Sequence, residues 1–331
     1  MDKNSTTPVA KFADARRSEK QKPQERQVVL VLQGGGALGA YQAGVYHALH
    51  ENSIEPDWII GTSIGAINAS LIAGNARADR LERLKEFWTR MAYRPPFGVP
   101  AWTGLPDMLA YCQTLFRGIP AFFEPNPAAF LGTHVPLGVD SAGFYSTAPL
   151  EKTLRELVDF SLVNQCKPRL TVGAAHVRTS EMKYFDSRDG EIGVKHIMAS
   201  GALPPAFPAV RIDGELYWDG GILSNTPTEV IFDDNPRKNS LIFAVHLWNP
   251  MGEEPGSIWE VLNRHKDIQY SSRVASHIAR QRQMHRMRHV VSELVKLLPE
   301  DVRKTPFASD LAEYGCRTTM HVVRLLAPQL E

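Results

Sequence analysis

A serine between two glycines, at residues 61–65 (GTSIG), constrains the fold of this chain more than any other feature. A short apolar run precedes this pentapeptide, and an Ala-rich segment of helical composition follows it. In that context G-x-S-x-G predicts a nucleophile elbow, in which the chain leaves a strand, turns at Ser63 and enters a helix. Gly61 and Gly65 are then required, because a side chain would clash where strand and helix meet. The pentapeptide alone is equally compatible with a serine that caps a helix.

A glycine-rich segment lies upstream, after a continuous apolar run at residues 28–32 that is typical of a buried parallel strand. The segment, residues 33–39 (QGGGALG), leads into a helix-like stretch. Its consecutive glycines Gly34, Gly35 and Gly36 leave their backbone N–H groups unshielded, and the helix behind them adds its positive end. The loop therefore predicts an anion site, for either a phosphate or an oxyanion.

The phosphate alternative has a specific form. Gly34, Gly36 and Gly39 fit the dinucleotide pattern G-x-G-x-x-G, and Asp57 follows at about the expected 20 residues. In that fingerprint the acid belongs at the carboxyl end of the second strand, whereas Asp57 precedes the strand that begins at Trp58. The serine motif occupies the carboxyl end instead. A nucleotide-binding oxidoreductase is therefore the less favoured alternative.

A third segment, residues 214–221 (GELYWDGG), reads as a short strand that ends in Asp219 and two glycines, Gly220 and Gly221. An acid followed by paired glycines is, taken alone, most often a turn. Beside a glycine-rich loop and a serine elbow, however, Asp219 becomes a candidate general base.

Together, these three segments resemble the three motifs of the patatin-like phospholipases, in the order that the family has them. The resemblance covers about residues 28–245, and the stretch at 199–208 is also similar to the family's. It implies an α/β fold: a mostly parallel central sheet flanked by helices, as a three-layer sandwich related to the α/β-hydrolases. Residues 247–273 resemble a C-terminal extension found in a bacterial branch of the family, whose role stays open.

The resemblance also implies a mechanism, that of a serine acyl hydrolase of the lipase or phospholipase A type, with no cofactor and no metal. Ser63 would attack an ester carbonyl, and Asp219 would take its proton and later activate water. The implied oxyanion hole is Gly34, Gly35 and Gly36, and the implied supporting glycines are Gly61, Gly65, Gly220 and Gly221. An aspartate with an ordinary pKa of about 3.9 is a weak base for this task. A dry site can raise its basicity, and a helix end can ease deprotonation of the serine, but the sequence does not decide whether either does so.

The chain departs from the family at one position of the oxyanion loop. The family often carries Arg or Lys just before the final glycine, where this chain has Leu38. The backbone donors are unaffected, but attraction for an anionic head group is weaker. Two alternatives on the same fold stay open, a non-catalytic lipid-binding protein and an acyltransferase that uses the same dyad.

A conventional Ser-His-Asp triad would need a histidine. His246 closes an apolar, strand-like run and follows Ser63 and Asp219 in the usual chain order, so it is the best triad candidate. A histidine held by an ordinary loop contact is nevertheless the favoured interpretation. His285 and His289 share a helix face but lack the glutamate of H-E-x-x-H, so no zinc site is predicted there.

The composition excludes several classes of protein. A net charge of +1 gives no case for nucleic acid, and three isolated cysteines fit a reducing compartment. No run reaches the roughly 18 apolar residues of a membrane span, and the first residues lack a signal-peptide layout. We therefore predict a cytoplasmic enzyme whose partner is a lipid or ester substrate. The sequence leaves the oligomeric state open.

The predicted organisation has three parts. Residues 1–26 are polar and read as a disordered tail, and residues 27–250 form the catalytic domain. Within that domain, residues 93–144 are rich in proline, glycine and aromatics. We interpret them as a cap whose aromatic side chains, Phe122 and Phe123 among them, provide apolar walls for an acyl chain. An insertion that only packs its own aromatics is an equally weighted alternative.

Residues 251–331 form the third part, a helical extension that returns to the core. Its long helical region, residues 257–298, is dense in arginine and histidine, and a last strand is predicted at residues 319–326. A basic amphipathic helix can lie on anionic lipid, which would allow peripheral contact with a membrane surface. A solvated helix face is the favoured interpretation.

Overall fold

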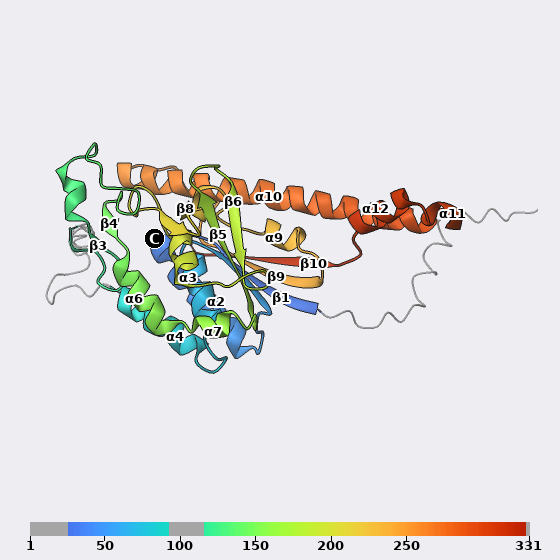
Figure 1. The fold of residues 1–331 in the computed structure, drawn as a ribbon, viewed down its shortest axis with the longest axis horizontal. Helices are drawn as coiled ribbons and strands as arrows, with labels where there is room; N and C mark the ends of the chain where they lie inside the picture. Colours follow the sequence, from blue (N-terminus) through green and yellow to red (C-terminus); the bar gives the residue numbers. More distant parts are fainter. Residues whose placement is uncertain (1–25, 93–115, 329–331) are drawn as a thin grey trace, which may run out of the picture.

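The computed structural model describes residues 26–92 and 116–328 of the chain. Within them the backbone forms a mixed eight-stranded sheet with helices on both faces (Figure 1). The strand order is β10-β9-β1-β2-β5-β8-β7, and β6 pairs with β5 beside this path. The parallel strands are β1 (Arg26–Leu32), β2 (Trp58–Thr62), β5 (Arg169–His176), β9 (Asn239–His246) and β10 (Met320–Leu326). The antiparallel strands are β6 (Met182–Asp186), β7 (Val210–Ile212) and β8 (Glu215–Asp219).

The helices form a layer on each face of the sheet. One face is covered by α2 (Ala40–Glu51), α3 (Ile64–Ala73), α4 (Arg80–Met91), α6 (Ala148–Leu157), α7 (Phe160–Val163) and α8 (Val194–Ser200). On the other face lie α9 (Glu229–Phe232) and the long helix α10 (Ile258–Leu297), which runs along the sheet in Figure 1. Two further helices, α11 (Glu300–Arg303) and α12 (Pro306–Tyr314), lead back to β10. None of the helices in the described part of the chain is both long and apolar enough to traverse a bilayer.

The apolar pattern of the central strands explains this layering. In β1, Leu30 and Leu32 pack into the cluster on the α2 and α3 side, while Val29 and Val31 pack into the cluster around α9. Successive side chains of a strand point to opposite faces. A strand that is covered on both faces therefore has to be apolar at every position, as the run at residues 28–32 is.

The predicted fold class is confirmed, and most predicted elements are found within a residue or two of their expected bounds. One boundary was wrong. Arg26, assigned to the tail, is the first residue of β1 and pairs with Asn239 of β9. Helices α6 and α7 are separate, because α6 ends at Leu157 and the Asp159 side chain accepts a hydrogen bond from Ser161 N to cap α7.

The segment expected to form a cap is described only in part, since residues 93–115 lie outside the described residues. Residues 116–144 carry a short strand, β3 (Glu124–Pro125), and a short 3-10 helix, η5 (Pro127–Leu131). β3 pairs with β4 (Tyr145–Ser146) in a separate two-stranded sheet. The rest of the predicted tail, residues 1–25, also lies outside the described residues.

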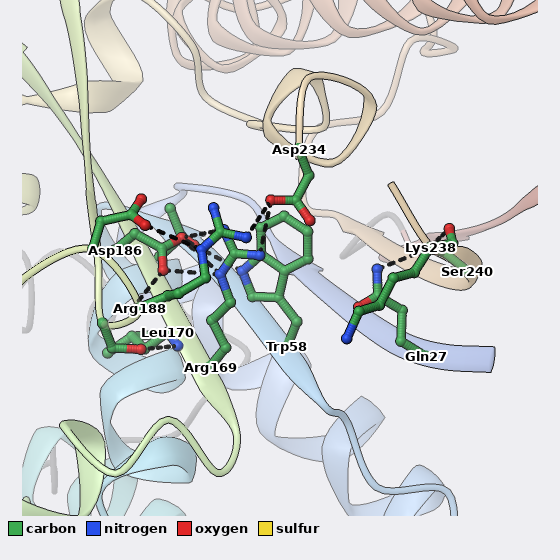
Figure 2. A network of polar contacts seen from close by, with 12 residues as sticks. Gln27, Trp58, Arg169, Leu170, Asp186, Arg188, Asp234, Lys238 and Ser240 are labelled. Carbon is green, nitrogen blue, oxygen red and sulfur yellow. Dashed lines mark hydrogen bonds and ion pairs between the residues drawn. The ribbon is translucent and has the colours of Figure 1, made fainter. Parts of the chain in front are cut away.

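The amino ends of β2 and β5 are joined by the buried ionic network of Figure 2. The Arg169 guanidinium lies 3.8 Å from the Trp58 ring centroid and reaches the carboxylates of Asp186 at 2.7 Å and Asp234 at 3.0 Å. Burial raises the pKa of Asp186, but hydrogen bonds from Arg169 and Thr171 outweigh it and hold the pKa below its usual value. This network fixes β2 and β5 at the end of the sheet opposite to the serine elbow.

Removing one charge of this network should destabilise the fold. We expect Asp186→Asn to lower the free energy of unfolding by about 3 kcal/mol, because Arg169 then loses a buried partner. Asp189→Asn is the control, since Asp189 is 65% exposed and, among the described residues, its ion pair is with Arg188 alone. Its effect should stay below about 1 kcal/mol. Urea unfolding measures both changes, and equal losses would contradict a structural role for the Asp186 ion pair.

Candidate active site

Ser63 stands at the turn between β2 and α3 with a backbone φ of 58° and ψ of −128°. A positive φ is strained for a residue with a side chain and costs on the order of 1–3 kcal/mol. Ser200 stabilises this backbone conformation, because its hydroxyl accepts a hydrogen bond from Ser63 N at 2.9 Å and donates one to Gly173 O at 2.6 Å. The Ser63 side chain makes no capping hydrogen bond to α3, so the alternative of a helix-capping serine is wrong.

The glycines around Ser63 are required by close backbone contact. A Cβ on Gly65 would lie 2.1 Å from the carbonyl oxygen of Leu32, and one on Gly61 would lie 2.4 Å from that of Gly65. Neither neighbour can move without shifting the backbone of β1 or α3. The expected clash at the strand–helix junction is therefore confirmed at Gly61, whereas Gly65 is restricted by the neighbouring strand β1.

Strand register brings Asp219 next to the elbow. On β5, Gly173 pairs with Thr62 of β2, and the next residue, Ala174, pairs with Asp219 of β8. Because β6 occupies the other edge of β5 along this stretch, β2 and β8 share one edge and their ends meet. The structure thus brings Ser63 and Asp219 together from positions 156 residues apart (219 − 63), and both line one cavity.

The environment of Asp219 changes its acidity. Its side chain is 2% exposed, and this burial raises the pKa of Asp219 to about 7. Hydrogen bonds from the Ser63 hydroxyl and from Gly221 N, the latter at 2.7 Å, oppose the increase. Burial therefore makes Asp219 more basic than an ordinary aspartate.

Gly221 is packed as tightly as the glycines of the elbow. A Cβ on Gly221 would lie 2.7 Å from Asn225 Oδ1 and 3.0 Å from Asp219 Oδ1. At Gly220 a Cβ would lie 2.5 Å from the carbonyl oxygen of Gly173. Both positions after the acid are thus restricted to glycine by their neighbours.

The oxyanion loop requires a correction. Gly34, Gly35 and Gly36 lie above the end of β1, but Gly34 N donates to the carbonyl oxygen of Asn225 at 3.1 Å. That amide is already paired and cannot serve as an oxyanion donor in this arrangement. Gly35 and Gly36 open the 3-10 helix η3 (Gly36–Gly39), where the first N–H groups have no partner inside the helix.

An apolar cavity of about 490 Å³ opens at Ser63. Its polar lining includes Ser63 and Asp219, and its walls are mainly aromatic and aliphatic. The wall residues include Trp88, Met91, Ile119, Phe122, Phe123, Leu203 and Phe207. The rings of Phe122, Phe123 and Phe207 contact one another, with centroids 5.6 to 6.1 Å apart. Both phenylalanines predicted as walls for an acyl chain therefore line the cavity.

His246 does not complete a triad. It lies at the end of β9, on the same face as Ile242 and Ala244, which pack with α9, whereas α3 covers the opposite face. Its side chain is buried, and this burial lowers the pKa of His246 to about 4. The two helical histidines, His285 and His289, both hydrogen-bond the carbonyl oxygen of Thr318 at 3.0 and 2.9 Å.

The dinucleotide alternative also fails on geometry. Asp57 Oδ2 accepts a hydrogen bond from Val28 N at 2.7 Å, near the beginning of β1. The glycine loop follows the other end of that strand. Asp57 is therefore at the opposite end of β1 and cannot contact a ribose bound at Gly34–Gly36.

Sequence reasoning missed three residues that hold the site: Ser200, Asn225 and Trp248. Ser200 fixes the elbow, while Asn225 and Trp248 donate to the carbonyl oxygen of Gly34 at 2.9 and 2.8 Å. The stretch at residues 199–208 was singled out, but nothing in it indicated a role for the hydroxyl. No local pattern marked the other two, because their partner is about 190 to 215 positions away.

A serine at a strand–helix turn, beside a buried acid and an apolar cavity, is the arrangement of the α/β acyl-hydrolase class. A family model described as patatin-like phospholipase matches residues 30–232, and one described as patatin phospholipase matches residues 268–331. The first covers more than half of the chain. The chain therefore belongs to the patatin-like phospholipase family, which supports a lipid ester hydrolase.

Curated relatives match over a limited part of their length. The chain is 28% identical over 206 residues to patatin-like phospholipase domain-containing protein 7 of Rattus norvegicus, covering 61% of this chain and 12% of that protein. It is 48% identical over 250 residues to lysophospholipase nte1 of Aspergillus oryzae, covering 72% and 13%. It is 28% identical over 213 residues to the cGAMP-activated phospholipase of Pseudomonas aeruginosa, covering 60% and 54%. The chain thus spans about an eighth of the rat and Aspergillus proteins.

Among solved structures, VipD from Legionella pneumophila aligns with a TM-score of 0.38 at 15% identity, covering 95% of this chain and 67% of that one.

Proposed function

We propose that this chain is a serine acyl hydrolase that cleaves carboxylic esters of lipids through a Ser63–Asp219 dyad. The observation that carries the proposal is that strand register brings Ser63 and the buried Asp219 together at the same apolar cavity. A nucleophile with a base in hydrogen-bond contact is the arrangement that covalent catalysis needs. Membership of the patatin-like phospholipase family supports the same reaction class.

Acylation begins with attack of Ser63 Oγ on the ester carbonyl carbon. As the new C–O bond forms, the hydroxyl proton passes to the Asp219 carboxylate and the carbonyl oxygen becomes an oxyanion. The N–H groups of Gly35 and Gly36 are the proposed donors to that oxyanion, and one such donor is typically worth about 3 kcal/mol. When the intermediate collapses, the bond to the leaving oxygen breaks and Asp219 returns its proton to the departing alcohol.

Deacylation repeats the sequence with water. Asp219 takes a proton from a water molecule, whose oxygen attacks the acyl carbon on Ser63. The second oxyanion uses the same amides, and its collapse breaks the bond to Ser63 Oγ, which regains a proton from Asp219. The product is a free carboxylic acid, and the dyad returns to its starting state.

The cavity supports a substrate with an extended acyl chain. Its walls of Phe122, Phe123 and Phe207 offer no charge, so they suit a hydrocarbon better than a polar head group. Leu38, at the position where the family often carries a cation, packs against the main apolar core instead. Recognition by the acyl chain is therefore favoured over recognition by an anionic head group.

The dyad is tested by removing each member. We expect Ser63→Ala and Asp219→Asn each to lower kcat for p-nitrophenyl esters and phospholipids by about 1,000-fold or more, since the two groups act as a unit. Circular dichroism should show that the fold is unchanged. His246→Ala is the control for a buried titratable residue on the other face of the sheet, and it should retain turnover. Activity of Ser63→Ala within tenfold of wild type would refute the dyad.

The pH dependence follows from the buried base. Only the carboxylate form of Asp219 accepts a proton, and its pKa is raised to about 7. We therefore expect kcat/KM to fall about tenfold per pH unit below that value and to level off above it. A stopped assay with one short-chain ester across about pH 5 to 9 measures the profile. A flat profile would mean that no group with this pKa acts as the base.

The aromatic wall is tested by chain length. Replacing Phe122 and Phe123 by Ser should lower kcat/KM for long-chain esters by about 100-fold while short-chain esters lose less than about threefold, because only a long chain reaches the wall. Phe130→Ser is the control, since Phe130 is 65% exposed and does not line the cavity. If short and long esters lose activity equally, Phe122 and Phe123 do not bind the acyl chain.

A further inference from the structure

The chain between β9 and α10 passes directly beneath the oxyanion loop. Leu247 N donates to the side-chain oxygen of Gln33 at 2.5 Å, and Trp248 N approaches the same oxygen at 3.3 Å. The Leu247 side chain packs on Gly35, where a Cβ would lie 2.7 Å from Leu247 Cδ1. Leu247 and Trp248 therefore pack against the oxyanion loop from one side, and we call them the floor of the loop.

The carbonyl oxygen of Gly34 is held by two side chains. Trp248 Nε1 donates to it at 2.8 Å and Asn225 Nδ2 donates at 2.9 Å. This carbonyl and the Gly35 N–H belong to one peptide unit, which is planar and trans, so the two groups point in opposite directions. Because Trp248 and Asn225 hold the Gly34 carbonyl oxygen in place, the Gly35 N–H is held pointing in the opposite direction.

The floor is in turn attached to α10. The Trp248 ring lies against the Tyr270 ring, with centroids 5.0 Å apart at 30°. Asn249 N donates to Asp267 Oδ1 at 3.2 Å, and Arg264 donates to the carbonyl oxygens of Asn249 and Pro250 at 3.1 and 2.8 Å. All three helix residues lie in the first half of α10.

The same helix also packs behind the loop that carries the acid. Tyr270 and His277 of α10 line a small cavity together with Gly221 and Asn225. Asn225 Oδ1 lies close to both glycine motifs, since a Cβ on Gly34 would approach it to 2.3 Å and one on Gly221 to 2.7 Å. Helix α10 thus contacts segments that support both the oxyanion loop and the loop after Asp219.

We propose that the C-terminal extension positions the oxyanion hole, through contact of Tyr270 with Trp248 and the hydrogen bond from Trp248 to Gly34. Trp248 and Tyr270 are positioning residues, because they act on the Gly35 amide and do not line the cavity at Ser63. The inference rests on the proposed ester hydrolysis and assigns the extension a part in turnover. Their contribution is expected in kcat, since the oxyanion exists only in the transition state and its neighbours.

The test separates the hydrogen bond from the ring contact. Trp248→Phe keeps an aromatic ring but removes the N–H, and we expect kcat to fall about tenfold with KM unchanged, as for a misaligned oxyanion donor. Tyr270→Ala should give a similar loss, and Tyr270→Phe, which keeps the ring, should restore kcat to within about twofold of wild type. Tyr314→Ala in α12 is the matched control, because this half-exposed aromatic lies in the extension but contacts Arg288 and Met284 instead.

Wild type and Ser63→Ala are measured in the same assay, together with the melting temperature of each variant. If Ser63→Ala keeps wild-type turnover, the proposed function fails. If Ser63→Ala is inactive while Trp248→Phe retains wild-type kcat, only the positioning role is overturned. A rise in KM at constant kcat, or a loss of kcat that merely follows the folded fraction, would overturn it as well.

Discussion

The site depends on the way in which one edge of β5 is shared by two strands. Residues 169–173 of β5 pair with β2, and residues 174–176 pair with β8 in the opposite direction. The end of β2 and the end of β8 consequently meet, which places a serine and an acid in contact without a long side chain to connect them. A slip by one residue would turn Asp219 to the other face of the sheet. The ionic network around Arg169 stabilises the same strands at their far end, and so helps to hold this register.

What the sequence could predict was local. The requirement for Gly61 follows from the shape of a tight strand–helix turn, and the apolar run of β1 follows from burial on both faces. Neither conclusion needs knowledge of distant residues. Family resemblance, carried by three motifs together, then supplied the pairing of Ser63 with Asp219, which no spacing rule in the chain could provide.

What the sequence could not predict depended on partners far along the chain. Gly34 was expected to donate to an oxyanion like its two neighbours, but its amide is paired with the carbonyl of Asn225. Three identical glycines offer no local signal to distinguish them. The chain order Ser63, Asp219, His246 was compatible with a triad, yet strand alternation turns His246 toward the face that α9 covers. Whether a residue at this position faces α3 or α9 depends on a shift of one residue along the strand, and the order of residues in the chain does not reveal it.

The proposed dyad leaves little tolerance in position. An aspartate is short and ends a strand, so it cannot follow a nucleophile that moves, and its raised pKa depends on its burial. Both demands are met by packing: Asn225 fills the space between Gly34 and Gly221, and Ser200 fixes the backbone of Ser63. Because α10 covers Trp248 and Asn225 from behind, the extension belongs to the packing around Ser63, Asp219 and the Gly35 amide, the proposed nucleophile, base and oxyanion donor.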